Sequence, residues 1–69
     1  MIKVGQIRQE HDEDWIYTVT YKTPEYDEWH IITNYGCVLR CGSNSLEKDT
    51  LIAEYPTWQE AVNSKEFNR

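Results

Sequence analysis

Apolar and polar residues alternate most regularly between Trp15 and Lys22. One side of this extended segment is aromatic or β-branched, and it is formed by Trp15, Tyr17, Val19 and Tyr21. Such side chains fit the pleated surface of a half-buried sheet and are disfavoured in helices. The pattern predicts a strand over residues 15–22 whose aromatic face points to the core.

An earlier strand is predicted from Ile2 to Arg8. Ile2 and Val4 keep a period of two, but Ile7 falls one residue out of phase after Gly5. Glycine within a strand often marks an inserted residue, so we expect a bulge at Gly5.

The middle of the chain predicts an antiparallel hairpin. Residues 28–33 and the segment after Gly36 have strand character, and the three residues 34–36 turn the chain. A three-residue loop ending in glycine suits a hairpin whose last loop residue is left-handed. The register that follows pairs Thr33 with Cys37, Ile31 with Leu39, and Trp29 with Cys41.

The C-terminal part changes from a strand to a helical pattern. Residues 50–55 read as a last strand, with Leu51, Ala53 and Tyr55 on one side, and residues 42–45 before it read as a loop. Thr57 and Glu60 have the spacing of a capping box, which predicts a helix from Thr57 to about residue 66. A helix this short must dock to be stable, and the aromatic face of the sheet is the expected dock, with Phe67 folding back onto the core.

These elements predict a single α+β domain over residues 1–69. We expect an antiparallel sheet of four or five strands in meander order, with one C-terminal α-helix packed on one face. A 69-residue chain buries about 60% of the surface that its unfolded form exposes, so its core supplies no more than about 3–5 kcal/mol. The thin core and an unpaired strand edge favour a homodimer.

Composition narrows the classes of partner. The chain has a net charge of −5, and its seven Lys and Arg residues are spread along the sequence, so a nucleic-acid partner is not expected. No segment has the roughly 18 apolar residues of a membrane span, and the N-terminus lacks an apolar run of signal-peptide length. Two cysteines do not make a disulfide framework, so we expect reduced thiols and a cytoplasmic location.

The acidic residues are unevenly distributed. Residues 10–28 hold seven carboxylates against the single base Lys22, which gives this stretch a charge of −6. They gather in two turns at opposite ends of the predicted strand over residues 15–22. These turns could steer the protein toward a basic partner, or they could simply be solvated. The candidate partner-binding residues are Asp12, Glu13, Asp14, Glu25, Tyr26, Asp27 and Glu28, with Tyr26 as an aromatic anchor if it does not fold over its own hairpin.

Catalytic and metal chemistry find weaker support. His11, His30, Cys37 and Cys41 are the ligand types of a structural zinc site, but both thiols alternate with Leu39 on a predicted strand and His30 falls on its other face. The same separation argues against a Cys-His nucleophile. No phosphate loop, nucleophile elbow or His-Glu-x-x-His helix occurs, so we expect no enzyme activity, no metal and no other cofactor.

Two segments resemble small uncharacterised proteins encoded by phages and prophages of Gram-positive bacteria. They are the opening residues 2–7 (IKVGQI) and the ending residues 51–67 (LIAEYPTWQEAVNSKEF), in which a strand leads directly into a capped helix. The resemblance implies a class of small, acidic, frequently dimeric proteins that bind and disable host or defence proteins or sequester a small signalling molecule. It carries no functional residues over to this chain.

The sequence therefore favours a non-enzymatic protein-binding module, of the type of a phage inhibitor, that uses the two acidic turns. The alternative is a protein that binds or sequesters a small, nucleotide-like anion. Its pocket would lie between protomers and be lined by tryptophans and tyrosines, with Arg40 or Lys48 for the anionic group.

Overall fold

A computed structural model describes residues 1–68 as five strands and two short helices. In chain order these elements are β1 (Gln6–Gln9), β2 (Ile16–Lys22), β3 (Trp29–Thr33), β4 (Val38–Cys41), α1 (Ser43–Glu47), β5 (Thr50–Glu54) and α2 (Trp58–Val62). The predicted α+β class is confirmed.

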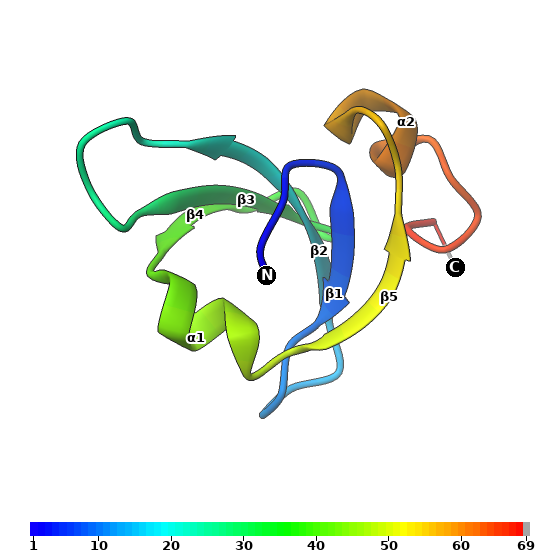
Figure 1. Cartoon of the computed structure of the whole chain (residues 1–69). Helices are drawn as coiled ribbons and strands as arrows, with labels where there is room; N and C mark the ends of the chain where they lie inside the picture. The colour runs from blue at the N-terminus through cyan, green and yellow to red at the C-terminus, as the bar shows by residue number, and fades with distance from the viewer. Residues whose placement is uncertain (69) are drawn as a thin grey trace.

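The five strands form one antiparallel sheet in the order β4-β3-β2-β1-β5. The first four strands follow one another as the predicted meander. The chain then passes through α1 to the far edge of the sheet, where β5 pairs with β1. Figure 1 shows the resulting sheet strongly curled, with α1 and α2 on different sides of it.

The predicted hairpin is confirmed in register. Trp29 pairs with Cys41 and Ile31 with Leu39, while the Thr33 N–H donates to the Cys37 carbonyl at 2.8 Å. Gly36 has a φ of +88°, the left-handed conformation that this loop requires.

Each face of the sheet carries its own apolar cluster, and a different helix covers each one. On the first, which we call the α1 face, Leu46 of α1 packs with buried residues that include Tyr17, Val19 and Ile31. On the second, the α2 face, Ala61 of α2 packs with the buried Ile7, Ile16 and Phe67. The expectation of one C-terminal helix on the aromatic face is therefore wrong, although Phe67 does fold back onto a core.

α1 occupies residues that the sequence predicts as loop. Its first N–H, from Ser43, donates to the Asp27 carboxylate at 3.3 and 3.4 Å, and Leu46 is buried on the α1 face. A carboxylate at a helix start satisfies orphan N–H groups and suits the helix dipole. Because this cap comes from 16 residues away, the local sequence around Ser43 does not reveal the helix.

Two inserted residues shift the phase of strands relative to the predicted alternation. Between Val19 and Tyr21 of β2 the pairing advances by one residue of β3, so Thr20 is the extra residue. Likewise Ile52 is extra in β5, because Ile7 pairs with Ala53 and Arg8 with Leu51. Ile52 consequently joins Ala53 and Tyr55 on the α2 face instead of pointing the other way.

Both ends of the chain depart from their predicted bounds. The first strand begins at Gln6, because Lys3 to Gln6 form a turn in which Gly5 has a φ of +94°. The Glu60 N–H donates to the Thr57 hydroxyl at 3.2 Å, as the capping box predicts, but the Glu60 carboxylate accepts from that hydroxyl instead of the Thr57 N–H. α2 ends at Val62, and turns continue the chain to Phe67.

Candidate functional site

An open groove lies on the α2 face of the sheet. Its lining comes from three strands and one helix, through Thr20, Tyr21, Ile32, Val38 and Trp58. Its volume is about 330 Å³, within the range of sites that bind small molecules or single side chains. Tyr21 and Val38 are 51% and 64% exposed, so apolar surface is accessible here.

The bulge at Thr20 places Tyr21 in this groove. If β2 alternated regularly through Thr20, Tyr21 would lie with Val19 on the α1 face, as the sequence pattern predicts. With the bulge, Tyr21 pairs with His30, and the two rings stand edge to face with centroids 5.3 Å apart. The predicted inward position of Tyr21 is therefore wrong.

The groove continues toward basic groups at the β3–β4 edge. Ile32 pairs with Val38, and two residues along each strand His30 pairs with Arg40. Side chains two positions apart share a face, so His30 and Arg40 lie on the α2 face beside the groove. Arg40 is exposed.

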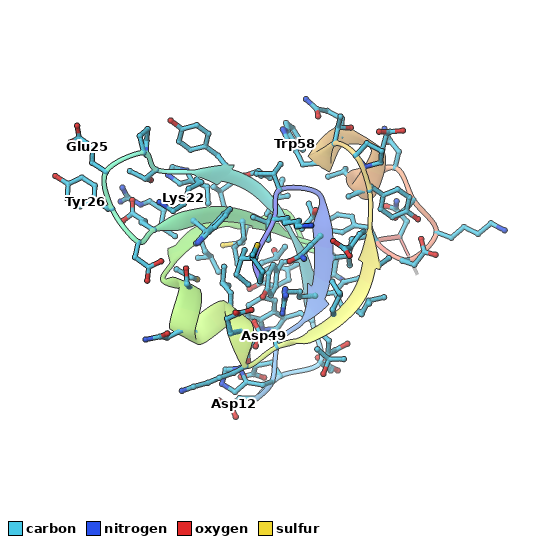
Figure 2. All side chains as sticks on the ribbon, viewed as in Figure 1. Asp12, Lys22, Glu25, Tyr26, Asp49 and Trp58 are labelled. Atoms are coloured by element: carbon cyan, nitrogen blue, oxygen red, sulfur yellow. The ribbon has the colours of Figure 1, made fainter. Side chains whose placement is uncertain are left out.

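The loop between β2 and β3 holds one of the two predicted acidic turns. Asp27 is bound to Ser43, and Glu28 accepts from the Thr23 hydroxyl at 3.1 Å, so these two carboxylates stabilise the fold. Glu25 is exposed, and Tyr26 is 67% exposed with its ring directed outward in Figure 2. Tyr26 does not fold over its hairpin.

The other acidic turn, between β1 and β2, lies at the far end of the molecule. Figure 2 shows Asp12 on the opposite side from Glu25 and Tyr26. The turn is organised locally, since Asp12 N–H donates to Glu10 at 2.6 Å and the Glu13 carbonyl accepts from Gln9 at 3.0 Å. Asp12, Glu13 and Asp14 are exposed there, and the seven candidate residues form two separate patches.

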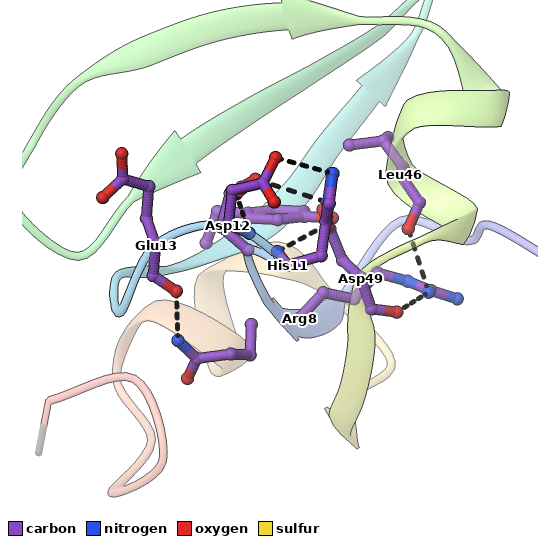
Figure 3. Close-up of polar contacts among 9 residues, drawn as sticks. Arg8, His11, Asp12, Glu13, Leu46 and Asp49 are labelled. Carbon is purple, nitrogen blue, oxygen red and sulfur yellow. Dashed lines mark hydrogen bonds and ion pairs between the residues drawn. The ribbon is translucent and has the colours of Figure 1, made fainter.

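A buried carboxylate ties this turn to the rest of the fold. The side chain of Asp49 is only 4% exposed, and its oxygens accept from the Tyr17 hydroxyl at 2.5 Å and from the His11 N–H at 3.0 Å (Figure 3). The His11 ring also contacts Asp49, with Nδ1 at 2.5 Å from Oδ1. Since an ionised carboxylate only accepts, Nδ1 carries the proton.

Arg8 extends the same network to α1. Its side chain is buried, and Nη1 donates to the carbonyls of Leu46 at 3.2 Å and Asp49 at 3.0 Å (Figure 3). Nε donates to the Gln6 side chain at 3.0 Å. The guanidinium thereby satisfies carbonyls at the C-terminal end of α1, where a cation suits the helix dipole.

The electrostatics at His11 favour a structural role over that of a catalytic base. We call the bonds of His11 to Asp49 and Asp12, which hold the β1–β2 turn, the tether. The hydrogen bond to Asp49 raises the pKa of His11, and the nearby charges of Asp12 and Glu10 raise it further. Both ring nitrogens face carboxylates, because Nε2 lies 3.2 Å from Asp12. An imidazolium held in this way donates two hydrogen bonds and has no free lone pair for proton abstraction.

One group of potential metal ligands occurs among the described residues 1–68. Glu10, His11 and Asp12 each offer an atom, all within 4.8 Å of one another. A metal at His11 would compete with its bonds to Asp49 and Asp12, so we assign this group to the tether. The four zinc-type residues weighed from sequence do not gather, since this group contains neither thiol nor His30.

Both cysteines are free thiols of intermediate exposure. Burial raises the pKa of the Cys41 thiol, and the charges of Asp49 and Glu10 raise it further. A raised pKa lowers the fraction of the reactive thiolate, so Cys41 reacts slowly at neutral pH and packs as an apolar group on the α1 face.

Comparisons with protein-family models, curated proteins and solved structures gave no match to this chain. The resemblance to small phage proteins therefore stays a prediction. Neither helix within residues 1–68 has the length and apolar character needed to cross a lipid bilayer.

The groove could not be predicted from the sequence, because its lining residues belong to three separate sequence patterns, those of β2, of the β3–β4 hairpin and of α2. Tyr21 reads as core, Ile32 and Val38 as the back of a hairpin, and Trp58 as the docking side of a helix. Only the bulge at Thr20 and the position of α2 bring them together. A signal for the groove exists in Val38, an apolar residue on the face that the hairpin register leaves outside the aromatic cluster.

Proposed function

We propose that this protein is a non-enzymatic protein-binding module, acting as small phage inhibitors do, by occupying the surface of a host or defence protein. The observation that carries the proposal is the accessible groove of Tyr21, Ile32, Val38 and Trp58, which stays open while two separate clusters fill the core. Apolar surface that remains exposed and is rimmed by polar residues marks interaction sites.

The β2–β3 loop supplies the second part of the proposed docking surface. Tyr21 lies two residues before this loop begins at Thr23, and in this proposal the docking surface extends from the groove along β2 to the exposed pair Glu25 and Tyr26. Figure 2 shows Trp58 and Glu25 along the same side of the molecule. Tyrosine contributes large, rigid contact area at low entropic cost, which suits Tyr26 as an anchor.

The charge of the chain indicates the chemistry of the partner. With a net charge of −5, the protein attracts basic surfaces, and Glu25 stands exposed beside Tyr26. The partner we propose is a protein that presents a basic surface next to an apolar side chain. In this proposal the turn of Asp12, Glu13 and Asp14 adds long-range steering, because it lies too far from the groove to share a contact.

The test is affinity capture from the lysate of a Gram-positive host, followed by titration of the captured partner with tyrosine variants. We expect Tyr21→Ala and Tyr26→Ala each to weaken binding by about fivefold or more, a loss of over roughly 1 kcal/mol, with little change in melting temperature. Tyr35→Ala is the matched control, because Tyr35 is similarly exposed at 62% but lies in the other hairpin turn, against Trp15.

The outcomes separate the parts of the proposal. Equal affinity for wild type and Tyr21→Ala would remove the groove from the docking surface. A large drop in the melting temperature of Tyr26→Ala would show that Tyr26 supports the fold instead. Rising salt should weaken capture, because the proposed steering acts between exposed charges.

The groove also favours a second candidate, a small aromatic anion of the nucleotide type. Its volume is in the range of small-molecule sites, Trp58 and Tyr21 offer aromatic surfaces, and Arg40 lies on the same face. A thermal-shift screen with nucleotides distinguishes the two candidates. If a nucleotide raises the melting temperature of the wild type but not of Tyr21→Ala, and if no protein partner is captured, the small-molecule hypothesis becomes the better one.

A further inference from the structure

The outer edge of β4 carries backbone groups that are free to pair. The Thr33 N–H donates to the Cys37 carbonyl, so the groups of this pair face each other, and hydrogen-bonded and non-hydrogen-bonded pairs alternate from there along the hairpin. By this alternation Leu39 and Cys41 direct their N–H and C=O groups to β3, whereas Val38 and Arg40 direct theirs away from the sheet. Within residues 1–68 no other strand pairs with this edge.

The opposite edge of the sheet is protected in a way that β4 is not. β5 contains the inserted residue Ile52, and a bulge twists an edge and interrupts its regular row of donors and acceptors. β4 is regular over Val38–Cys41, contains no proline, and exposes Val38 beside its free groups. An unprotected regular edge is a template for another strand.

The sequence of β4 makes this edge complementary to itself. Two copies related by a two-fold axis must match outward groups with outward groups, which allows Val38 opposite Val38, Val38 opposite Arg40, or Arg40 opposite Arg40. Only the second register uses all the outward groups of Val38 and Arg40, in four backbone hydrogen bonds. It also keeps the two arginines from facing each other, and like charges directly opposite destabilise a sheet.

We propose that the protein is a homodimer in which the β4 strands of two copies pair antiparallel, with Leu39 on the two-fold axis and Val38 opposite Arg40 of the partner subunit. The two sheets then form one continuous sheet. Because Val38 and Arg40 both lie on the α2 face, the partner's Arg40 stands beside Val38 at the groove of each protomer. This inference rests on the β4 edge and goes beyond the proposed binding function.

The distance between cysteines of the two subunits depends on this register, so a cross-link between them tests it. With Leu39 on the axis, Cys37 of one copy lies opposite Cys41 of the partner subunit, in a non-hydrogen-bonded pair whose Cα atoms are about 4.5 Å apart. That separation is within the range of a disulfide. Within one chain the same cysteines are four strand residues apart, about 13 Å, and cannot bridge.

The first experiment measures mass and cross-linking. Sedimentation should give a species of twice the 8.3 kDa chain mass. Added diamide should then form covalent dimers, as each pair of thiols loses two electrons and two protons to diamide and makes one S–S bond. Trypsin cleaves after Arg40, between the two cysteines, so the peptides joined in the dimer band identify the linkage. We expect Cys37 joined to Cys41, and a monomer at all concentrations overturns the proposal.

Single-cysteine variants make the test specific. In Cys37→Ser or Cys41→Ser alone, the remaining thiol faces a serine in the partner subunit, so neither variant should cross-link with itself. An equal mixture of the two should recover covalent dimers through mixed pairs. Self-linkage of either variant through two Cys37 or two Cys41 residues overturns the register.

A backbone variant tests the edge itself. Val38→Pro removes an outward N–H without breaking the bonds between β3 and β4, and so removes two of the four intersubunit bonds. It should weaken dimerisation by about tenfold or more. Val38→Thr keeps the N–H and should stay dimeric. A folded, dimeric Val38→Pro protein, judged by circular dichroism and sedimentation, contradicts pairing through β4.

Discussion

Gly5 gives the sharpest test of how the two ends of the chain meet. Its φ is +94°. The Gly5 N–H donates to the Val19 carbonyl at 2.9 Å, and the Gly5 carbonyl accepts from the Tyr55 N–H at 3.0 Å. A Cβ added here would lie 2.1 Å from the Tyr55 carbonyl oxygen, far inside van der Waals contact. The absence of a side chain at Gly5 is what lets β5 approach the turn before β1.

The expected cost of Gly5→Ala has two parts. The left-handed conformation costs a residue with a Cβ about 1–2 kcal/mol. Moving backbone to relieve an overpacked contact costs about 1–3 kcal/mol more. We therefore expect a loss of about 3 kcal/mol in the free energy of unfolding, against a total of about 3–5 kcal/mol for a domain of this size.

Gly36→Ala is the matched control for this substitution. Gly36 has nearly the same φ, +88°, but no atom lies within 4 Å of the position of an added Cβ. It should lose only the backbone part, about 1–2 kcal/mol. Urea unfolding followed by tryptophan fluorescence measures both variants. Equal losses would refute the close approach of Tyr55, because both glycines have nearly the same φ and only at Gly5 does an added Cβ meet another atom.

Two further predictions concern the tether and the helix cap. The folded state raises the pKa of His11, so its stabilising contribution is complete below the unfolded pKa of about 6.5 and is lost as pH rises through the higher folded value. Urea midpoints should fall over that pH window in the wild type but stay flat in His11→Asn. His30→Asn is the control and should behave like the wild type, because the His30 ring contacts the Thr23 hydroxyl. A fall that persists in His11→Asn contradicts the tether. Thr57→Ala should lower the free energy of unfolding by about 1 kcal/mol through loss of the α2 cap, whereas Thr57→Ser keeps the hydroxyl and most of the stability.

The sequence predicted those parts of the fold that depend on neighbours along the chain. The β3–β4 hairpin register follows from the turn that ends at Gly36, and the start of α2 follows from the side chain of Thr57. In both cases the deciding contacts join residues three to twelve positions apart. Local patterning is sufficient for such elements.

The parts that sequence did not reveal depend on contacts between distant segments. α1 needs Asp27 as its cap, and the face on which α2 docks depends on β5 crossing to β1. For the same reason the sequence could not show which residues of the second acidic turn stabilise the fold and which are available to a partner. Asp27 and Glu28 serve the fold, while Glu25 and Tyr26 remain exposed, and nothing in the run from Glu25 to Glu28 distinguishes them.

The bulge at Thr20 shows that strand pairing, as well as amino-acid type, determines what this protein displays. If the same sequence paired without the bulge, Tyr21 would turn to the α1 face and Lys22, now over the Trp29 ring at 5.8 Å, would turn away from it, so the groove would lose a wall. Deleting Thr20 would instead make β2 regular and leave Tyr21 opposite His30, because the pairs on either side of the bulge keep their register. The surface of this protein therefore tolerates the loss of one residue at this point in β2 better than a change that removes the bulge and keeps the strand length.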